Sequence, residues 1–151
     1  MMGRLLTTCL ILLVPAMAQA GAWGPSSFEN DDALDWVGDC ADGRLPHAVE
    51  AAFATAMQAS YIQAPDASAA VAAAEVVATA IGKPPPRPPA ELANCVKRQS
   101  AQDLRKLVPA ARRVLARIRD RKISELSQLW GETKSDDWPE AISDLESRLA
   151  K

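Results

Sequence analysis

The apolar positions of this chain recur at the spacing of amphipathic α-helices. In the first such segment they fall at intervals of three and four residues and share one helix face: Ala33, Trp36, Val37 and Cys40. Asn30 is suited to cap the start of this helix, and Gly43 is suited to end it. A second amphipathic helix is predicted from Pro46 to about Tyr61.

The third segment, Ala67 to Ile81, is apolar on nearly all sides. Pro65 is suited to open this helix, and Gly82 is suited to close it in the left-handed conformation. A helix of this kind usually lies at the centre of its bundle. Its only polar side chains are Ser68, Glu75 and Thr79.

Residues 83–89, Lys-Pro-Pro-Pro-Arg-Pro-Pro, cannot be helical and are predicted to form an extended surface link. The rest of the chain returns to helical spacing, with almost no alternation typical of strands. The predicted segments run from Pro89 to Arg98, around Ser100, from Val108 to Ile118, from Ser124 to Trp130 and from Trp138 to Leu149. We therefore predict an all-α, single-domain, compact array of six or seven helices over residues 21–151.

The first twenty residues resemble a secretory signal peptide. Arg4 supplies a positive start, Leu5–Val14 is a mostly apolar run, and Ala18-Gln19-Ala20 has the form of a signal-peptidase site. The apolar run is too short for a membrane anchor, and cleavage would leave Gly21 as the first residue. An uncleaved N-terminal helix is the alternative. The segment predicts a periplasmic or secreted protein without a stable membrane anchor.

Two cysteines, Cys40 and Cys95, would stay in the cleaved chain. In an oxidising compartment an even number of cysteines is usually paired. A bond between them would close a 55-residue loop and stabilise the fold by roughly 4 kcal/mol at most. We predict one disulfide, and two buried free thiols are the alternative.

Charge is divided unevenly between the two parts of the chain. Residues 21–82 hold nine acids and one base, whereas residues 83–151 hold ten acids and fifteen bases. Either the two halves fold against each other and partly neutralise, or one of them presents a charged surface to a partner. The basic stretch Lys97–Lys122 lacks aromatic residues and the whole chain is net negative. With export in addition, we expect no nucleic-acid partner.

Little in the sequence points to a metal or to nucleophilic catalysis. His47 is the only histidine, and no serine stands in a Gly-x-Ser-x-Gly motif. The acids between Glu29 and Asp35 lack the glycine of a calcium loop, and they suit the first turn of a helix. We expect no metal and no cofactor.

Glu75 is a single carboxylate on the alanine-rich central helix, where an unpaired charge is costly to bury. Three environments are open to it. It lies at the rim of the fold, or it pairs with an arginine or lysine of the basic half, or it occupies a cleft with a shifted pKa. The last of these would make it a candidate site residue.

Four acids are predicted to line the polar side of the first helix, away from Trp36 and Cys40: Asp32, Asp35, Asp39 and Asp42. Their spacing follows the helical period, so the four carboxylates share one side. This face is either merely solvated or a surface for a partner, and the partner would then be basic.

The N-terminal motif resembles the bacterial family named domain of unknown function 4259. The motif has three parts: Gly21-Ala22-Trp23-Gly24, then Phe28 to Ala33, which includes Asp31, and then Asp35-Trp36. Weaker similarity to the family lies at residues 73–78, 125–130 and 138–149. The resemblance implies no activity and no catalytic residue. Physically, Trp23, Phe28 and Trp36 could pack together and hold the N-terminus over the core, with Gly24 in a tight turn. A ligand-binding role for the acids beside them is the alternative.

We therefore expect an exported, non-enzymatic helical binding protein. An inhibitor or immunity protein that masks a toxin is one concrete version, by analogy with other small exported helical proteins. Its partner would be an unidentified protein, basic if the acidic face is the binding surface. The rival expectations are a carboxylate-dependent hydrolase that uses Glu75 and Asp35, and a structural envelope protein.

Overall fold

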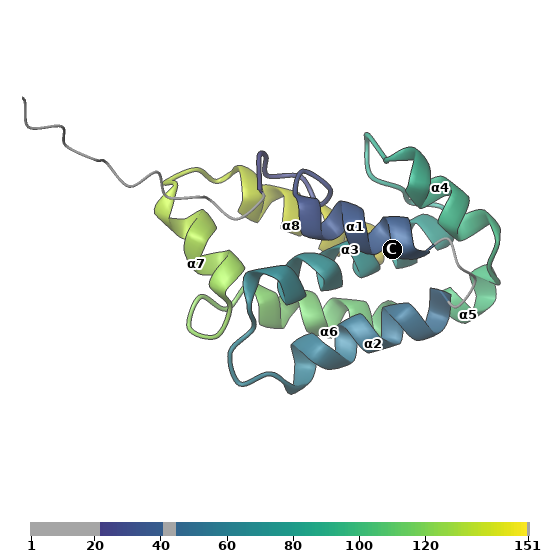
Figure 1. Cartoon of the computed structure of the whole chain (residues 1–151), viewed down its shortest axis with the longest axis horizontal. Coiled ribbons are helices and arrows are strands. Elements are labelled where there is room, and N and C mark those ends of the chain that lie inside the picture. Colours follow the sequence, from purple (N-terminus) through teal and green to yellow (C-terminus); the bar gives the residue numbers. More distant parts are fainter. Residues whose placement is uncertain (1–21, 41–44, 151) are drawn as a thin grey trace, which may run out of the picture.

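Eight helices follow one another in the part of the chain that the structure describes, residues 22–40 and 45–150 (Figure 1). The structure is a computed structural model. Within those ranges there is no strand, and two isolated bridges join Ala22 with Asn30 and Ile62 with Ser124. The helices are α1 (Asp31–Asp39), α2 (Leu45–Gln58), α3 (Ala64–Ala80), α4 (Ala90–Lys97), α5 (Ala101–Arg105), α6 (Val108–Ile118), α7 (Glu125–Glu132) and α8 (Asp137–Ala150).

The predicted all-α fold is confirmed, and the number of helices exceeds the predicted six or seven by at least one. The turn expected around Ser100 is a helix of its own, α5. Ser100 accepts a hydrogen bond from the Asp103 N–H at 3.4 Å, so a separate cap starts this short helix after α4 has ended. The predicted end of α1 at Gly43 lies outside the described residues, and α1 as described ends at Asp39.

The α3 helix is the centre of the fold, as predicted from its lack of a polar side. It packs against each of the seven other helices, and residues 70–78 are all buried. Alanine makes this possible because its small side chain lets several helices approach one axis closely. At the end of α3, Gly82 has a φ of 84°, and the Lys83 N–H donates to the Ala78 carbonyl at 2.9 Å. This is the predicted left-handed cap, and residues 83–89 continue without helix as expected.

Local caps set the starts and ends of the surrounding helices. The Asn30 side chain accepts a hydrogen bond from the Ala33 N–H at 2.8 Å and so starts α1, as predicted. At the end of α2, the Arg117 guanidinium donates to the carbonyls of Ala56 and Ala59. One base of the basic half is therefore used to cap a helix of the acidic half.

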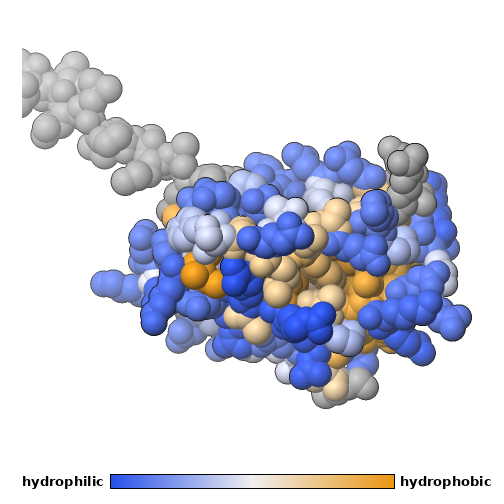
Figure 2. Space-filling view, turned by 90° about the horizontal axis from the view of Figure 1, so that it is seen from below, coloured by the Kyte–Doolittle hydropathy of each residue, from blue (hydrophilic) through white to orange (hydrophobic). Residues whose placement is uncertain are grey.

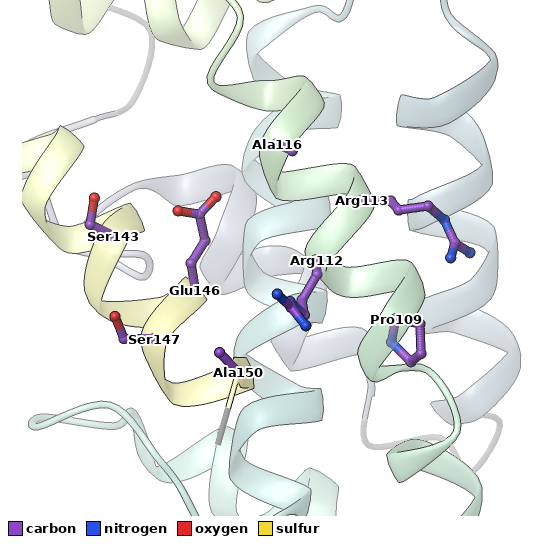
Figure 3. Close-up of a pocket in the computed structure, with 8 residues that line it drawn as sticks. All are labelled: Pro109, Arg112, Arg113, Ala116, Ser143, Glu146, Ser147 and Ala150. Carbon is purple, nitrogen blue, oxygen red and sulfur yellow. The ribbon is translucent and has the colours of Figure 1, made fainter.

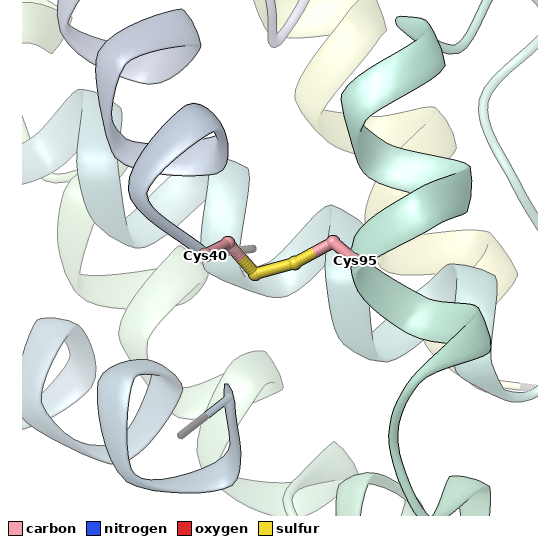
Figure 4. The surroundings of a disulfide bond; sticks show 2 residues. All are labelled: Cys40 and Cys95. Atoms are coloured by element: carbon pink, nitrogen blue, oxygen red, sulfur yellow. A yellow bond between two sulfur atoms is a disulfide. The ribbon is translucent and has the colours of Figure 1, made fainter. Parts of the chain in front are cut away.

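The predicted disulfide joins Cys40, directly after α1, to Cys95 in α4 (Figure 4). The two Cα atoms lie 5.8 Å apart, and both residues are buried. This bond connects the N-terminal helix with the segment that follows the proline-rich link. No helix in the described ranges combines the length and the apolar character that a membrane crossing requires.

Candidate functional site

Glu75 lies in the core, where it is 1% exposed and paired with Arg148 of α8. Two hydrogen bonds of 2.8 Å run from the guanidinium, one to each carboxylate oxygen. The Ser27 hydroxyl adds a third bond of 2.8 Å to Oε1. Of the three environments open to Glu75 in the sequence, the structure therefore shows the pair with a basic residue of the second half.

Arg148 is held on all sides by acceptors. Its Nε donates to Asp144 at 2.7 Å, and its Nη1 also donates to the Lys83 carbonyl at 3.0 Å. Burial alone would lower the pKa of the guanidinium, but the hydrogen bonds and charges of Glu75 and Asp144 outweigh burial and raise that pKa. The positive charge of Arg148 is therefore favoured where it meets Glu75.

This arrangement suits a structural role better than a catalytic one. Both oxygens of Glu75 are already engaged, so neither faces an open position where a substrate proton could be taken. Asp35, the other carboxylate of the expected hydrolase, is exposed on α1. What Glu75 does join is three separate parts of the chain: the N-terminal segment, α3 and α8.

The N-terminal segment is held by its own backbone hydrogen bonds. The N–H groups of Trp23 and Gly24 donate to the Glu29 carbonyl at 2.9 and 3.3 Å, and the Ser26 N–H donates to the Glu29 carboxylate at 2.9 Å. This last bond, with the Ser26 hydroxyl and the Arg87 charge, lowers the pKa of Glu29, while partial burial opposes the shift. A Cβ on Gly24 would overlap that carboxylate, so any larger residue here would have to displace the Glu29 side chain from its bond with Ser26.

The aromatic residues of the motif do not form the expected cluster over the core. Phe28 is buried in the core and Trp36 packs half-buried against it, but Trp23 is 59% exposed. The prediction that Trp23 helps to cover the core is wrong, because backbone hydrogen bonds fix its position and leave its ring in solvent. Asp31 is also exposed, in the first turn of α1.

The acidic side of α1 lies on the surface. Asp35 and Asp39 are exposed and Asp32 is half-buried, whereas Asp42 lies outside the described residues. No described residue forms an ion pair or a side-chain hydrogen bond with any of these three carboxylates. The acidic face, defined here as Asp32, Asp35 and Asp39, therefore receives no ion pair from the described part of the chain.

A groove of about 420 Å³ lies beside this face, between α1, α2 and α3. We call this groove between the three helices the alanine groove. Figure 2 views the molecule from the side on which α2 and α6 lie, and on that face weakly hydrophobic side chains gather inside a hydrophilic border. The walls of the alanine groove include Trp36 and Asp39 of α1, Ala51 and Thr55 of α2, and Asp66 and Ala69 of α3.

A second groove, of about 720 Å³, lies between α6 and α8 (Figure 3). Both Arg112 and Arg113 of α6 line this groove; the Arg112 side chain points toward α8, and the Arg113 side chain points to the other side of α6. Glu146, on the opposite wall, is bound to Arg119 at 2.6 Å. Arg119 and Glu146 both belong to the second half of the chain. Part of the positive charge of that half is therefore neutralised within it and not by the acidic face of α1.

Among the described residues, no group of three or more histidine, cysteine, aspartate or glutamate side chains is placed to hold a metal ion. His47 is 85% exposed beside Glu50 on the surface of α2. Sequence reasoning missed two residues of the buried polar centre, Ser27 and Arg148. The one signal in the sequence was the isolated carboxylate of Glu75. It indicated that a base of the second half could pair with Glu75, but it did not indicate which base.

The family model described as domain of unknown function (DUF4259) matches residues 21–141. The chain belongs to this family. The match begins at the residue that follows the Ala18-Gln19-Ala20 triplet, and it includes the N-terminal motif, the acidic face and the alanine groove. No curated protein and no solved structure matches the chain.

Proposed function

We propose that this member of the DUF4259 family is an exported, non-enzymatic binding protein that holds a basic partner protein on the acidic face of α1. The observation that carries the proposal is the unpaired state of Asp32, Asp35 and Asp39 on a helix whose other side is fixed to the core. Grouped like charges repel one another, and of these three carboxylates only Asp32 lies in the first turn of α1, where the helix dipole offsets that cost. A partner with positive charge would relieve that repulsion and be steered to this surface.

Export is part of the proposal and rests on two features of the chain. The signal-peptide pattern ends at Ala20, and the family match starts at the next residue. The Cys40–Cys95 disulfide suits an oxidising compartment, the periplasm or the exterior. An inhibitor or immunity protein that masks a basic toxin is the concrete version we favour. The engagement of both Glu75 oxygens supports this class over a carboxylate-dependent hydrolase.

The test compares three baits made from the mature protein, residues 21–151. One is wild type, one carries Asp35→Lys with Asp39→Lys, and the control carries Glu132→Lys with Asp136→Lys, which changes net charge equally at exposed positions away from α1. We expect wild type and control to capture the same basic protein from a periplasmic extract, and the α1 variant to lose it, with the wild-type complex weakening as salt rises. Equal capture by all three folded baits would overturn the proposal.

A further inference from the structure

We infer that the alanine groove receives an arginine or lysine side chain of the bound partner, carried on an otherwise apolar segment. The inference rests on the proposed function and names the contact by which the partner is recognised. The groove joins the acidic face directly, because Asp39 belongs to both. A partner drawn to α1 by charge therefore meets this hollow beside the acidic face.

The shape of the groove suits a side chain rather than a flat contact. Its volume of about 420 Å³ is in the range of small-molecule sites. Its α2 wall is built on Ala48, Ala51 and Ala52, whose short side chains leave the space open. An aliphatic stem can lie along these methyl groups and displace water from them.

The chemistry of the groove walls selects a cation. Asp39 stands on the α1 wall and Asp66 on the α3 wall, and no described residue pairs with either carboxylate. Asp66 lies in the first turn of α3, where the helix dipole favours its charged form. Trp36 is half-buried on the same wall as Asp39, and a tryptophan ring also attracts cations.

A guanidinium fits these walls better than an ammonium. It is planar and weakly hydrated, it stacks on aromatic rings, and it can bind a carboxylate through two parallel hydrogen bonds. The apolar neighbours of the basic residue would cover the methyl groups of the alanines that line the groove. The occupant is therefore a Leu-Arg-Leu type of segment rather than a run of bases.

The experiment uses a defined probe, N-acetyl-Leu-Arg-Leu-amide, titrated into the mature protein and followed by NMR. We expect saturable shifts of the Trp36 indole and of the groove alanine methyl groups. The matched probe replaces arginine with citrulline, which keeps the shape and removes the charge. We expect it to bind at least fivefold more weakly. Equal binding of the two probes, or no saturable shift with either, would overturn the inference.

Three variants locate the binding. Ala51→Phe fills the groove at an exposed position of α2, and Asp39→Asn with Asp66→Asn removes its charges; each should weaken the arginine probe at least fivefold. Gln58→Phe, exposed at the end of α2 and outside the groove, is the control and should bind as wild type. Full binding by both groove variants, with helical content intact, would refute the site.

The two proposals can fail separately. Asp35→Asn alters the acidic face without altering a groove residue, so it should weaken partner capture and leave probe binding unchanged. If the Ala51→Phe protein still captures the partner while Asp35→Lys with Asp39→Lys does not, the acidic face binds but the groove is not used. If the probe binds as expected and no bait captures a basic protein, the groove inference stands without the proposed function.

Discussion

The guanidinium of Arg148 holds both carboxylate oxygens of Glu75 at 2.8 Å, across 73 residues of sequence. The pair joins the last helix to the central one and lies almost entirely out of solvent. A buried ion pair returns its desolvation cost only when its geometry is good and its remaining hydrogen-bonding groups are satisfied. Ser27, Asp144 and the Lys83 carbonyl supply those further bonds.

Breaking this pair from one side should be costly. We expect Glu75→Gln to lower the free energy of unfolding by about 3–5 kcal/mol, because it leaves the Arg148 charge buried without its main partner. Asp144→Asn removes an exposed partner of the same arginine and should cost less than about 1 kcal/mol. Urea unfolding of the two variants measures the difference. Equal small losses would mean that the pair contributes little to stability.

A second comparison exchanges two glycines of the N-terminal region for alanine. Gly24→Ala should destabilise by about 1–3 kcal/mol, because the new methyl group meets the Glu29 side chain. Gly38→Ala adds a methyl group in open space on the exposed side of α1 and should stabilise by about 0.5–1 kcal/mol. Thermal unfolding of both proteins gives the signs. A neutral Gly24→Ala variant would show that the turn can rearrange.

The Glu29 carboxyl should titrate below its ordinary value of 4.5, since the Ser26 backbone N–H and hydroxyl stabilise the charged form. Because the pKa of Glu29 is lower in the folded than in the unfolded protein, its charged carboxylate stabilises the fold. That stabilisation is fully present above the pKa of the unfolded chain, and it is lost as the pH falls through the pKa of the folded protein. We therefore expect acid below about pH 4.5 to loosen the 23–29 turn. NMR titration of the carboxyl carbon, with Glu29→Gln to assign the step, checks this; a midpoint at or above 4.5 would contradict it.

The disulfide should contribute a large part of the stability. Replacing Cys40 and Cys95 together with serine opens a loop of 55 residues, and we expect a loss approaching 4 kcal/mol. Chemical unfolding of the oxidised protein and the double variant measures it. Intact mass after alkylation without reductant gives an independent check. Two alkylated thiols in the native protein would show that the bond does not form.

Much of the fold was accessible from local patterns. Asn30 as a cap, Gly82 as a left-handed stop and the uniformly apolar α3 were each predicted and are confirmed, because caps and helical faces depend on residues within a few positions of one another. The exposed acidic side of α1 followed from the same periodicity. The separate α5 was harder, since a helix of five residues has too few turns to show a period.

Two features of the site depended on contacts that no local pattern encodes. The sequence marked Glu75 as a carboxylate in need of a partner, yet several bases of the second half were equally available, and only the packing of α8 on α3 selected Arg148. In the same way, the aromatic residues of the motif led us to expect that Trp23 packs with Phe28. The backbone hydrogen bonds from Trp23 and Gly24 to Glu29 instead leave the Trp23 ring in solvent.

The sequence by itself determined the helical class, the helix caps, the cysteine pair and the acidic face, since each rests on residue type and short spacing. Only the tertiary structure decided the partner of Glu75, the exposure of Trp23 and the alanine groove. The groove is the space left between three helices, and that space depends on how α1, α2 and α3 are oriented when they bury their apolar faces together.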